Sequence, residues 1–289
     1  MPRMQRVQFS CFLLELRESC VSTTRAVPIM SLTPSLQWID NHCHLEDDSS
    51  LGSVLEASSE AGVTQMITVG TDAVSSASCV ALAAQYEQVW ATVGLHPHDA
   101  AEGLDAVLEV VKANAGNPKM VAIGECGLDY HYDHAPRQIQ RKVFAQQIAL
   151  AHEYDLPLVI HTRNAWEETF EILDAESIPT RTVFHCFTGG VDEAAGCIER
   201  GALLSISGIV TFPSADDVRS AVCSAPLSAL MVETDSPFLT PVPHRGKPNT
   251  PALVGLIGAE IARLHEVGLS IVANETTATA RQFYGLDAP

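Results

Sequence analysis

The sequence predicts an α/β protein with the architecture of a (β/α)₈ TIM barrel in a single domain, and three observations support this fold. Eight short apolar runs recur along the 289 residues, and neighbouring runs begin roughly 20 to 35 residues apart, the length of a strand–helix unit. The runs are apolar throughout, as in parallel strands buried on both faces. No Gly-x-Gly-x-x-Gly motif follows an early run, so the alternative, a doubly wound open sheet, has less support.

The predicted strands span residues 38–43, 65–69, 89–93, 120–123, 156–160, 182–184, 202–209 and 230–232. Between them lie helical patterns, the clearest of which covers residues 138–153. One face of this helix is marked by Ile139, Val143, Phe144, Ile148, Ala149 and His152. Eight strands that alternate with helices, with no second shift in composition, are typical of a closed barrel.

The first 34 residues differ in character from the rest. Four arginines interrupt a segment without a sustained period, and its best apolar run, residues 9–14, stops at Glu15 and is short for a secretory signal. We therefore expect residues 1–34 to be an N-terminal extension that is disordered or lies upstream of a true start at Met30. Residues 35–289 are expected to form the barrel.

Composition indicates an ordinary folded protein, with 46% hydrophobic and 18% charged residues. No stretch approaches the ~18 to 20 apolar residues needed to span a membrane. The eight cysteines are scattered and include no Cys-x-x-Cys pair. A chain of this size can build a core without disulfides, so we expect reduced thiols and a cytoplasmic location.

The formal net charge of −18 limits the partners that the protein can hold. A strongly acidic surface repels phosphate backbones, which argues against static, high-affinity binding of duplex DNA. A nuclease remains compatible with this charge, because divalent metal ions carry large local positive charge.

The end of the first predicted strand carries a metal-binding pattern, Asp40-Asn41-His42-Cys43-His44. Residues i and i+2 of a strand point the same way, with Cα atoms roughly 6.5 Å apart, so His42 and His44 can share one metal ion. Asp40 has the same parity and is expected to support a ligand.

Four other predicted strands also end in metal-binding or acid–base residues. Glu125 follows the fourth, His161 the fifth, His185 the sixth, and Glu233 and Asp235 the eighth. Active sites of such barrels are built at the carboxyl ends of the strands, so these side chains are expected to meet at one mouth. Chance accounts for one or two such endings, but not for five of eight.

Six nitrogen and oxygen ligands exceed what one catalytic zinc ion needs. Two divalent metal ions with a bridging carboxylate fit this inventory better, and Mg²⁺, Mn²⁺ and Zn²⁺ all suit the ligand types. Cys43, Cys126 and Cys186 each adjoin a ligand, and their opposite parity predicts that they point toward the helices.

The sequence resembles the TatD family of metal-dependent DNases, among the amidohydrolase-like barrels, over about residues 37 to 286. The motifs that carry the resemblance are Asp-Asn-His-Cys-His-Leu at 40–45, Gly-Leu-His-Pro-His at 94–98, Gly-Glu-Cys-Gly-Leu-Asp-Tyr at 124–130, Ile-His-Thr-Arg at 160–163, His-Cys-Phe-Thr-Gly at 185–189, Glu-Thr-Asp-Ser-Pro at 233–237 and Pro-His-Arg-Gly-Lys-Pro-Asn at 243–249. Seven motifs in order at matching strand ends make a specific match.

The resemblance implies roles for the cluster. One metal ion would be held by His42, His44 and Asp235, the second by His161 and His185, and Glu125 would bridge the two. Asp235 would also be the acid/base that acts on the attacking water, with Glu125 as the other catalytic residue. Glu233 would support a ligand.

Four further residues are expected to contact the substrate. Arg163, Arg245 and Lys247 would meet phosphates from the mouth loops. His96, at the end of the third strand, would contact substrate as well, with a structural role as the alternative.

The resulting hypothesis is a divalent-metal-dependent deoxyribonuclease, a 3'-5' exonuclease on single strands or accessible ends, that binds DNA transiently and has no membrane or obligate protein partner. The alternative keeps the barrel and metals but hydrolyses a small amide, ester or phosphotriester; such enzymes often bridge their metals with a carboxylated lysine where this chain has Glu125. A third hypothesis is a non-catalytic nucleic-acid-binding barrel.

Overall fold

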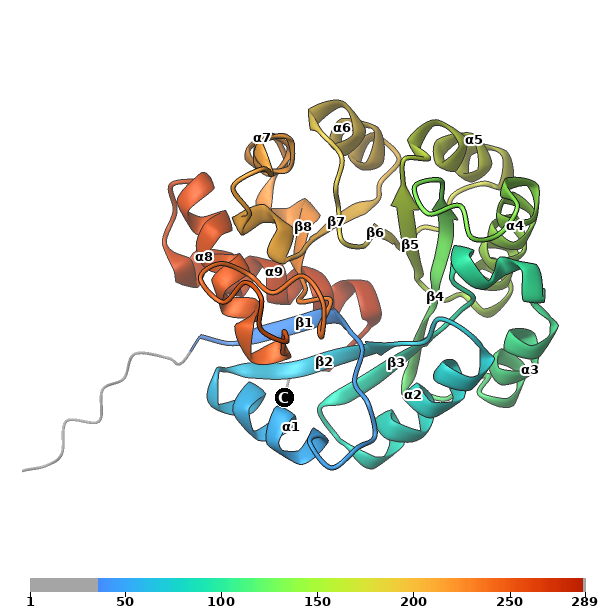
Figure 1. Cartoon of the computed structure of the whole chain (residues 1–289), viewed down its shortest axis with the longest axis horizontal. Coiled ribbons are helices and arrows are strands. Elements are labelled where there is room, and N and C mark those ends of the chain that lie inside the picture. Colours follow the sequence, from blue (N-terminus) through green and yellow to red (C-terminus); the bar gives the residue numbers. More distant parts are fainter. Residues whose placement is uncertain (1–35, 288–289) are drawn as a thin grey trace, which may run out of the picture. The chain divides into compact units, whose positions relative to one another are not determined.

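Eight parallel strands form one sheet in the order β1-β2-β3-β4-β5-β6-β7-β8. The computed structural model describes residues 36–287. The strands surround a common axis in Figure 1. Their bounds are β1 Trp38–Cys43, β2 Val63–Val69, β3 Val89–Val93, β4 Met120–Asp129, β5 Leu158–Arg163, β6 Thr182–Phe184, β7 Leu203–Ile206 and β8 Leu230–Val232. The predicted α/β barrel is therefore confirmed.

All α-helices but the last lie outside the ring of strands (Figure 1). The α-helices are α1 Leu51–Glu60, α2 Ala73–Gln85, α3 Asp105–Ala113, α4 Arg137–Tyr154, α5 Trp166–Glu176, α6 Val191–Glu199, α7 Asp216–Ser224, α8 Val254–Leu264 and α9 Leu269–Tyr284. Short 3₁₀ helices are η1 Pro97–Glu102, η2 Gly208–Thr211, η3 Leu227–Ala229 and η4 Pro251–Leu253. Within residues 36–287 no helix combines the length and apolar character that crossing a membrane requires. The predicted extension, residues 1–34, lies outside the described residues.

Hydrogen bonds beyond the regular ladders join the two ends of the sheet. The Asp235 backbone N–H donates to the carbonyl of His42 at 2.9 Å, and the His44 N–H donates to the carbonyl of Ser236 at 2.8 Å. Deeper in the barrel, the Asn41 side chain donates to the carbonyl of Val232 at 2.6 Å. The first strand and the segment after the last are thus held together where both carry candidate ligands.

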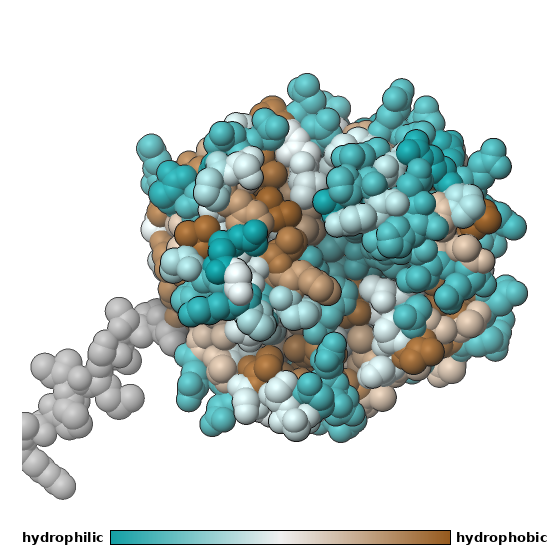
Figure 2. All heavy atoms as spheres, viewed as in Figure 1, coloured by the Kyte–Doolittle hydropathy of each residue, from teal (hydrophilic) through white to brown (hydrophobic). Residues whose placement is uncertain are grey.

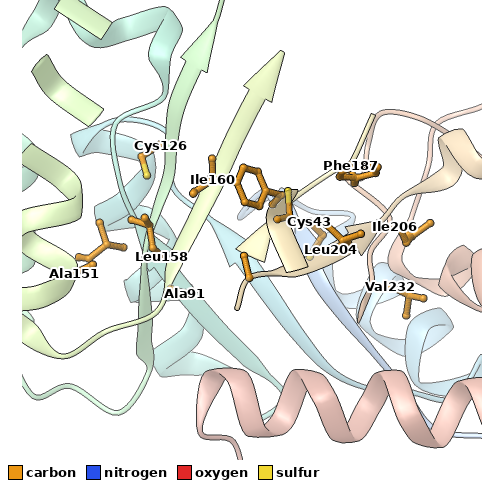
Figure 3. Close-up of a cluster of buried hydrophobic side chains, with 14 of the residues drawn as sticks. Cys43, Ala91, Cys126, Ala151, Leu158, Ile160, Phe187, Leu204, Ile206 and Val232 are labelled. Carbon is orange, nitrogen blue, oxygen red and sulfur yellow. The ribbon is translucent and has the colours of Figure 1, made fainter. Parts of the chain in front are cut away.

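The core has two parts. The larger lies between strands and helices, and Figure 3 shows members such as Cys126, Ala151 and Leu158. The smaller joins inward residues of six strands to the last turns of α9: Ile39, Ile67, Val121, Val159, Val183 and Met231 with Ala280, Phe283 and Tyr284. These strand residues precede the polar strand ends in sequence, so apolar packing fills the barrel below the candidate ligands.

Strand β4 is longer than predicted and runs to Asp129, because it continues to pair with β5 beyond an irregularity between Ile123 and Cys126. The pairing matches Gly127 with His161. A Cβ at Gly127 would collide with the carbonyl oxygen of His161, and its φ of +134° lies where side chains are strained. Glycine therefore allows the close approach that sets Glu125 beside His161.

The predicted buried face of α4 was partly wrong. Ile139, Ala149 and His152 are exposed, whereas Gln140 and Gln147 are fully buried. Gln147 accepts a hydrogen bond from the Leu95 N–H at 2.8 Å and donates to the Leu95 carbonyl at 2.9 Å. Apolar periodicity did not indicate these positions because polar side chains occupy them. Their amides form hydrogen bonds with backbone groups of neighbouring loops.

Candidate metal centre

A cavity of about 990 Å³ opens at the carboxyl ends of the strands. Its lining includes five of the six predicted ligands: His44, Glu125, His161, His185 and Asp235. The sixth, His42, is fully buried directly beneath, with Nε2 3.3 Å from Glu125 Oε2. Figure 2 shows a hollow near the middle of this face, lined mainly by hydrophilic residues. We call the six residues the ligand cluster.

One group within the cluster joins the first strand to the segment after the last. Nε2 of His44 lies 3.4 Å from Oδ1 of Asp235, and Nε2 of His42 lies 3.8 Å from the same oxygen. The ligand atoms of these three residues all lie within 4.8 Å of one another. Two imidazoles and a carboxylate at this spacing can hold a divalent metal ion.

Glu125 occupies the centre of the cluster. Its Oε1 lies 3.0 Å from Nδ1 of His161 and 2.8 Å from Nε2 of His185. Its Oε2 lies on the other side, 3.3 Å from Nε2 of His42. The two oxygens of one carboxylate thus face two different sets of imidazoles, which is the arrangement that a bridging ligand requires.

The ring of His185 stacks on that of His42, with centroids 3.8 Å apart and planes 13° from parallel. Nδ1 of His185 lies 3.3 Å from Glu233, which also accepts hydrogen bonds from the Cys186 N–H and the Ser205 hydroxyl. Glu233 therefore lies against the ring of His185 on the side opposite Glu125, the position from which second partners of metal-ligating histidines commonly act.

Asp129 supports His161 in the same way, and it was not among the predicted site residues. Its Oδ2 lies 3.0 Å from Nε2 of His161 and 3.1 Å from Nε2 of His98. Asp129 shares strand parity with Glu125, four residues earlier, so the two-residue period of β4 was a signal that could have found it.

His96 turns inward. Its Nδ1 accepts a hydrogen bond from the His98 N–H, and its Nε2 lies 3.4 Å from Oε1 of Glu125. His96, Glu125 and His161 form a second compact group with ligand atoms within 4.8 Å. The side chain thus contacts the central carboxylate, a position that suits a ligand or a positioning role as well as substrate contact.

The electrostatics of the cluster favour ionised carboxylates. Burial alone would raise the pKa of Glu125, but the imidazoles of His185 and His96 hold it well below its ordinary value. Burial together with the neighbouring His185 lowers the pKa of His42. Burial opposes protonation of His185 too, yet Glu125 and Glu233 raise its pKa well above the ordinary value. A metal ion would therefore displace a proton from His185 on binding.

The buried nitrogens of the cluster fit a bound cation. Among the described residues, the buried Nε2 atoms of His42 and His185, which both face Glu125, have no hydrogen-bond partner of acceptable geometry. Buried polar atoms without partners are costly, and a metal ion would accept their lone pairs. Imidazole and carboxylate donors suit Zn²⁺ or Mn²⁺, and the carboxylates also suit Mg²⁺.

Comparison with known proteins identifies the family. The family model described as "TatD related DNase" matches residues 39–285. The chain belongs to the TatD family. The "Uncharacterized metal-dependent hydrolase YabD" of Bacillus subtilis (strain 168) is 37% identical over 252 residues, which cover 86% of this chain and 99% of the relative.

Two further similarities bear on activity and fold. The "3'-5' ssDNA/RNA exonuclease TatD" of Klebsiella pneumoniae (strain 342) is 34% identical over 234 residues, covering 78% of this chain and 89% of that protein. The crystal structure of YJJV, a TatD homolog from Escherichia coli K12, superposes with a TM-score of 0.82 at 29% identity, covering 87% of this chain and 99% of that one. The chain is thus a TatD-family metal-dependent hydrolase whose His/Glu/Asp groups fit a divalent metal site.

Of the three cationic residues predicted to contact the substrate of this TatD-family protein, one lies in the cavity and two lie outside its lining. Arg163 lines the cavity, and its guanidinium stands 4.8 Å from the ring centroid of Tyr132. Arg245 stacks 3.8 Å from the ring centroid of Phe212, and Lys247 is exposed. Neither Arg245 nor Lys247 belongs to the cavity lining.

Two neighbours of the candidate ligands differ from expectation: Asp40 contacts a candidate ligand only through the backbone, and Cys186 does not point toward the helices. The carboxylate of Asp40 contacts none of the candidate ligand side chains. It accepts hydrogen bonds from the backbone N–H and the hydroxyl of Thr234. From His42, only the backbone N–H approaches it, at 3.5 Å. Cys186 lines the cavity instead of pointing toward the helices, because β6 ends at Phe184 and strand alternation no longer applies. Cys43 and Cys126 do lie in the core between strands and helices.

Proposed function

We propose that this protein is a divalent-metal-dependent deoxyribonuclease that hydrolyses phosphodiester bonds, as a 3'-5' exonuclease on single strands or accessible ends. The observation that carries the proposal is the position of Glu125, whose two oxygens face His42 on one side and His161 and His185 on the other. Similarity to a protein named as a 3'-5' ssDNA/RNA exonuclease supports the substrate class.

In the proposed site, His42, His44 and Asp235 would hold one ion, His161 and His185 would hold the other, and Glu125 would contribute its carboxylate to both. When bound, two divalent ions would supply Lewis-acid chemistry for the hydrolysis of a phosphodiester. The protein contributes the orientation of the donors, because Glu233 holds His185 and Asp129 holds His161.

Asp235 is the proposed acid/base. It lines the cavity, and burial would raise its pKa, but His44 and His42 hold the pKa below the ordinary value. It is therefore an ionised carboxylate that can orient water and take up its proton. Its backbone N–H donates to the carbonyl of His42, which fixes the carboxylate next to both imidazoles.

Arg163 is the proposed phosphate contact within the cavity, since its guanidinium can form two parallel hydrogen bonds to phosphate oxygens. Arg245 and Lys247 would contact phosphates farther along the strand, and His96 would act beside the central carboxylate. The net charge of −18 disfavours lasting electrostatic capture of nucleic acid, so the proposed complex with DNA is transient.

The alternative activity on small amides, esters or phosphotriesters has less support. Glu125 stands where many barrel hydrolases of that kind have a carboxylated lysine, and the lining of the cavity within residues 36–287 includes no lysine. An arginine in the cavity favours a phosphate over a neutral amide.

The test is a matrix of metals and substrates on chelator-stripped protein. Mg²⁺, Mn²⁺ and Zn²⁺ are each added to end-labelled single-stranded DNA, duplex DNA, RNA and a simple amide. We expect stepwise release of nucleotides from the 3' end of single strands with added metal, and a loss of kcat of about 100-fold or more in Asp235→Asn. Hydrolysis of the amide alone, or an Asp235→Asn enzyme that cleaves DNA normally, would overturn the proposal.

A further inference from the structure

Two exposed aromatic side chains stand at the cavity. Within residues 36–287, Tyr132 (52% exposed) and Phe238 (60% exposed) are the two aromatic members among the large apolar side chains that are well exposed. The others, Val74, Ile139, Val191, Val242 and Ile271, lie outside the cavity lining. A single exposed apolar residue needs no explanation, but two aromatic rings at one cavity suggest a ligand with flat apolar faces.

Tyr132 is held in place from below. Oδ1 of Asp129 accepts the backbone N–H of His131 at 2.9 Å and that of Tyr132 at 2.8 Å. The guanidinium of Arg163 covers the Tyr132 ring 4.8 Å from its centroid. The carboxylate that positions His161 therefore also fixes the loop that carries this ring, and a positive charge stands next to it.

Phe238 is fixed by its backbone. Its N–H donates to the carbonyl of Asp235 at 2.9 Å, and its own carbonyl accepts from the side chain of Asn249 at 2.6 Å. The ring meets that of His44 nearly edge to face, with centroids 6.1 Å apart. An exposed phenyl ring is thus anchored directly beside a candidate ligand.

The two rings come from opposite sides of the mouth. Tyr132 follows β4 and Phe238 follows β8, and these strands lie half-way around the ring from each other (Figure 1). The ligand cluster lies between the two strands, with Glu125 on β4 and Asp235 after β8. A cavity of about 990 Å³ is at the upper end of the range for a single small ligand, so more than one nucleotide unit has room.

We propose that Tyr132 and Phe238 are stacking platforms for unpaired bases on either side of the phosphodiester held over the ligand cluster. The inference rests on the proposed nuclease function and specifies its substrate: the enzyme would prefer single strands, whose bases are exposed. In a duplex both faces of each base are covered, so stacking on these rings requires the strand to open first. The net charge of −18 weakens the general attraction between the protein and phosphates. Base stacking would therefore supply the affinity that a basic groove supplies in other proteins that bind single strands.

The test compares Tyr132→Leu and Phe238→Leu with the conservative changes Tyr132→Phe and Phe238→Tyr. Leucine keeps an apolar side chain but removes the ring. With metal-loaded protein and single-stranded DNA, we expect each leucine variant to raise KM about 5- to 150-fold, as loss of about 1 to 3 kcal/mol of stacking implies, and the conservative variants to stay near wild type. Ile271→Ala, an exposed apolar change on α9 outside the cavity lining, is the matched control.

A second substrate separates stacking from structural effects. An oligonucleotide with abasic sites at its last residues keeps the phosphates but offers no bases. Because the abasic strand loses stacking on both rings, wild type should cleave it with a kcat/KM lowered at least as far as either single leucine variant lowers it on intact DNA. On the abasic strand, wild type and variants should be alike. Equal wild-type rates on intact and abasic strands, or unchanged KM in both leucine variants, would overturn the inference. If wild type cleaves neither strand, the proposed nuclease function itself fails.

Discussion

Oε1 of Glu125 lies 2.8 Å from Nε2 of His185, and both side chains are almost completely buried. A charged carboxylate is stable at such a site only when opposite charges or hydrogen-bond donors surround it. Imidazoles approach both oxygens of Glu125, so the carboxylate couples the two halves of the ligand cluster. The chemistry that we propose depends on this coupling.

Glu125→Gln should therefore weaken metal binding at both halves. Glutamine has the same shape but no charge, so we expect the apparent affinity for Mn²⁺ to fall by more than the about 10- to 100-fold typical of a supporting residue. Calorimetric titration of chelator-stripped protein measures this. Glu46→Gln, the same change at an exposed carboxylate of the cavity lining, should change the affinity less than about 2-fold. Wild-type affinity in Glu125→Gln would show that the carboxylate is no ligand.

Asp40→Asn should change how stability depends on pH. Burial, opposed by hydrogen bonds from Thr234, raises the pKa of Asp40 from 3.8 to about 8. Between these values the folded state keeps a proton that the unfolded state loses, so this group destabilises the fold progressively as pH rises, by up to about 1.4 kcal/mol per pH unit. Asparagine removes that dependence.

Urea unfolding of chelator-treated protein checks the direction in which the stability difference between Asp40→Asn and wild type changes with pH. From about pH 5 to about pH 8, the free energy of unfolding of Asp40→Asn, relative to wild type at the same pH, should rise by about 2–4 kcal/mol. A difference that stays constant across this range would mean that Asp40 is ionised throughout, held by its two hydrogen bonds from Thr234.

Gln147→Leu should destabilise the fold without removing any apolar contact. The buried amide satisfies both backbone groups of Leu95, and leaving two such groups without partners costs about 2–5 kcal/mol. Gln146→Leu, the same substitution at the adjacent exposed position, should change the unfolding free energy by less than about 0.5 kcal/mol. Equal effects of the two substitutions would contradict this account of α4.

The cations of the mouth should differ in their contribution to binding. Arg163 lines the cavity, whereas Arg245 and Lys247 lie outside its lining. Arg163→Ala is therefore expected to raise KM for single-stranded DNA the most, about 10-fold, and to reduce the slope of log affinity against log salt concentration by about 0.7. A larger effect of Lys247→Ala would place the strand along the outer segment instead.

The barrel and the meeting of the candidate ligands at its mouth could be predicted because both depend on local patterns. Short apolar runs followed by His, Glu or Asp mark where buried parallel strands reach the mouth, as at Ile160-His161 and Phe184-His185. Such patterns do not depend on which distant segment packs opposite them, so they can be recognised in a single sequence.

What could not be predicted depends on tertiary contacts. The burial of Gln140 and Gln147 follows from loop backbone that needs partners, which apolar periodicity does not register. Asp129 was missed because β4 was expected to end at residue 123, where its pairing with β5 continues to residue 129. Tyr132 and Phe238 lie in loops, where no periodic pattern indicates that two rings share one cavity.

The central claim is that the ligand cluster binds divalent metal and thereby hydrolyses phosphodiester bonds. The most direct measurement is the rate of nucleotide release from 3'-labelled single-stranded DNA while chelator-stripped protein is titrated with Mn²⁺. We predict no release before metal is added, a saturable rise with metal, loss on renewed chelation, and no rise in Asp235→Asn. Undiminished release from the stripped protein, or a metal-loaded wild type that releases no nucleotide, would contradict the account.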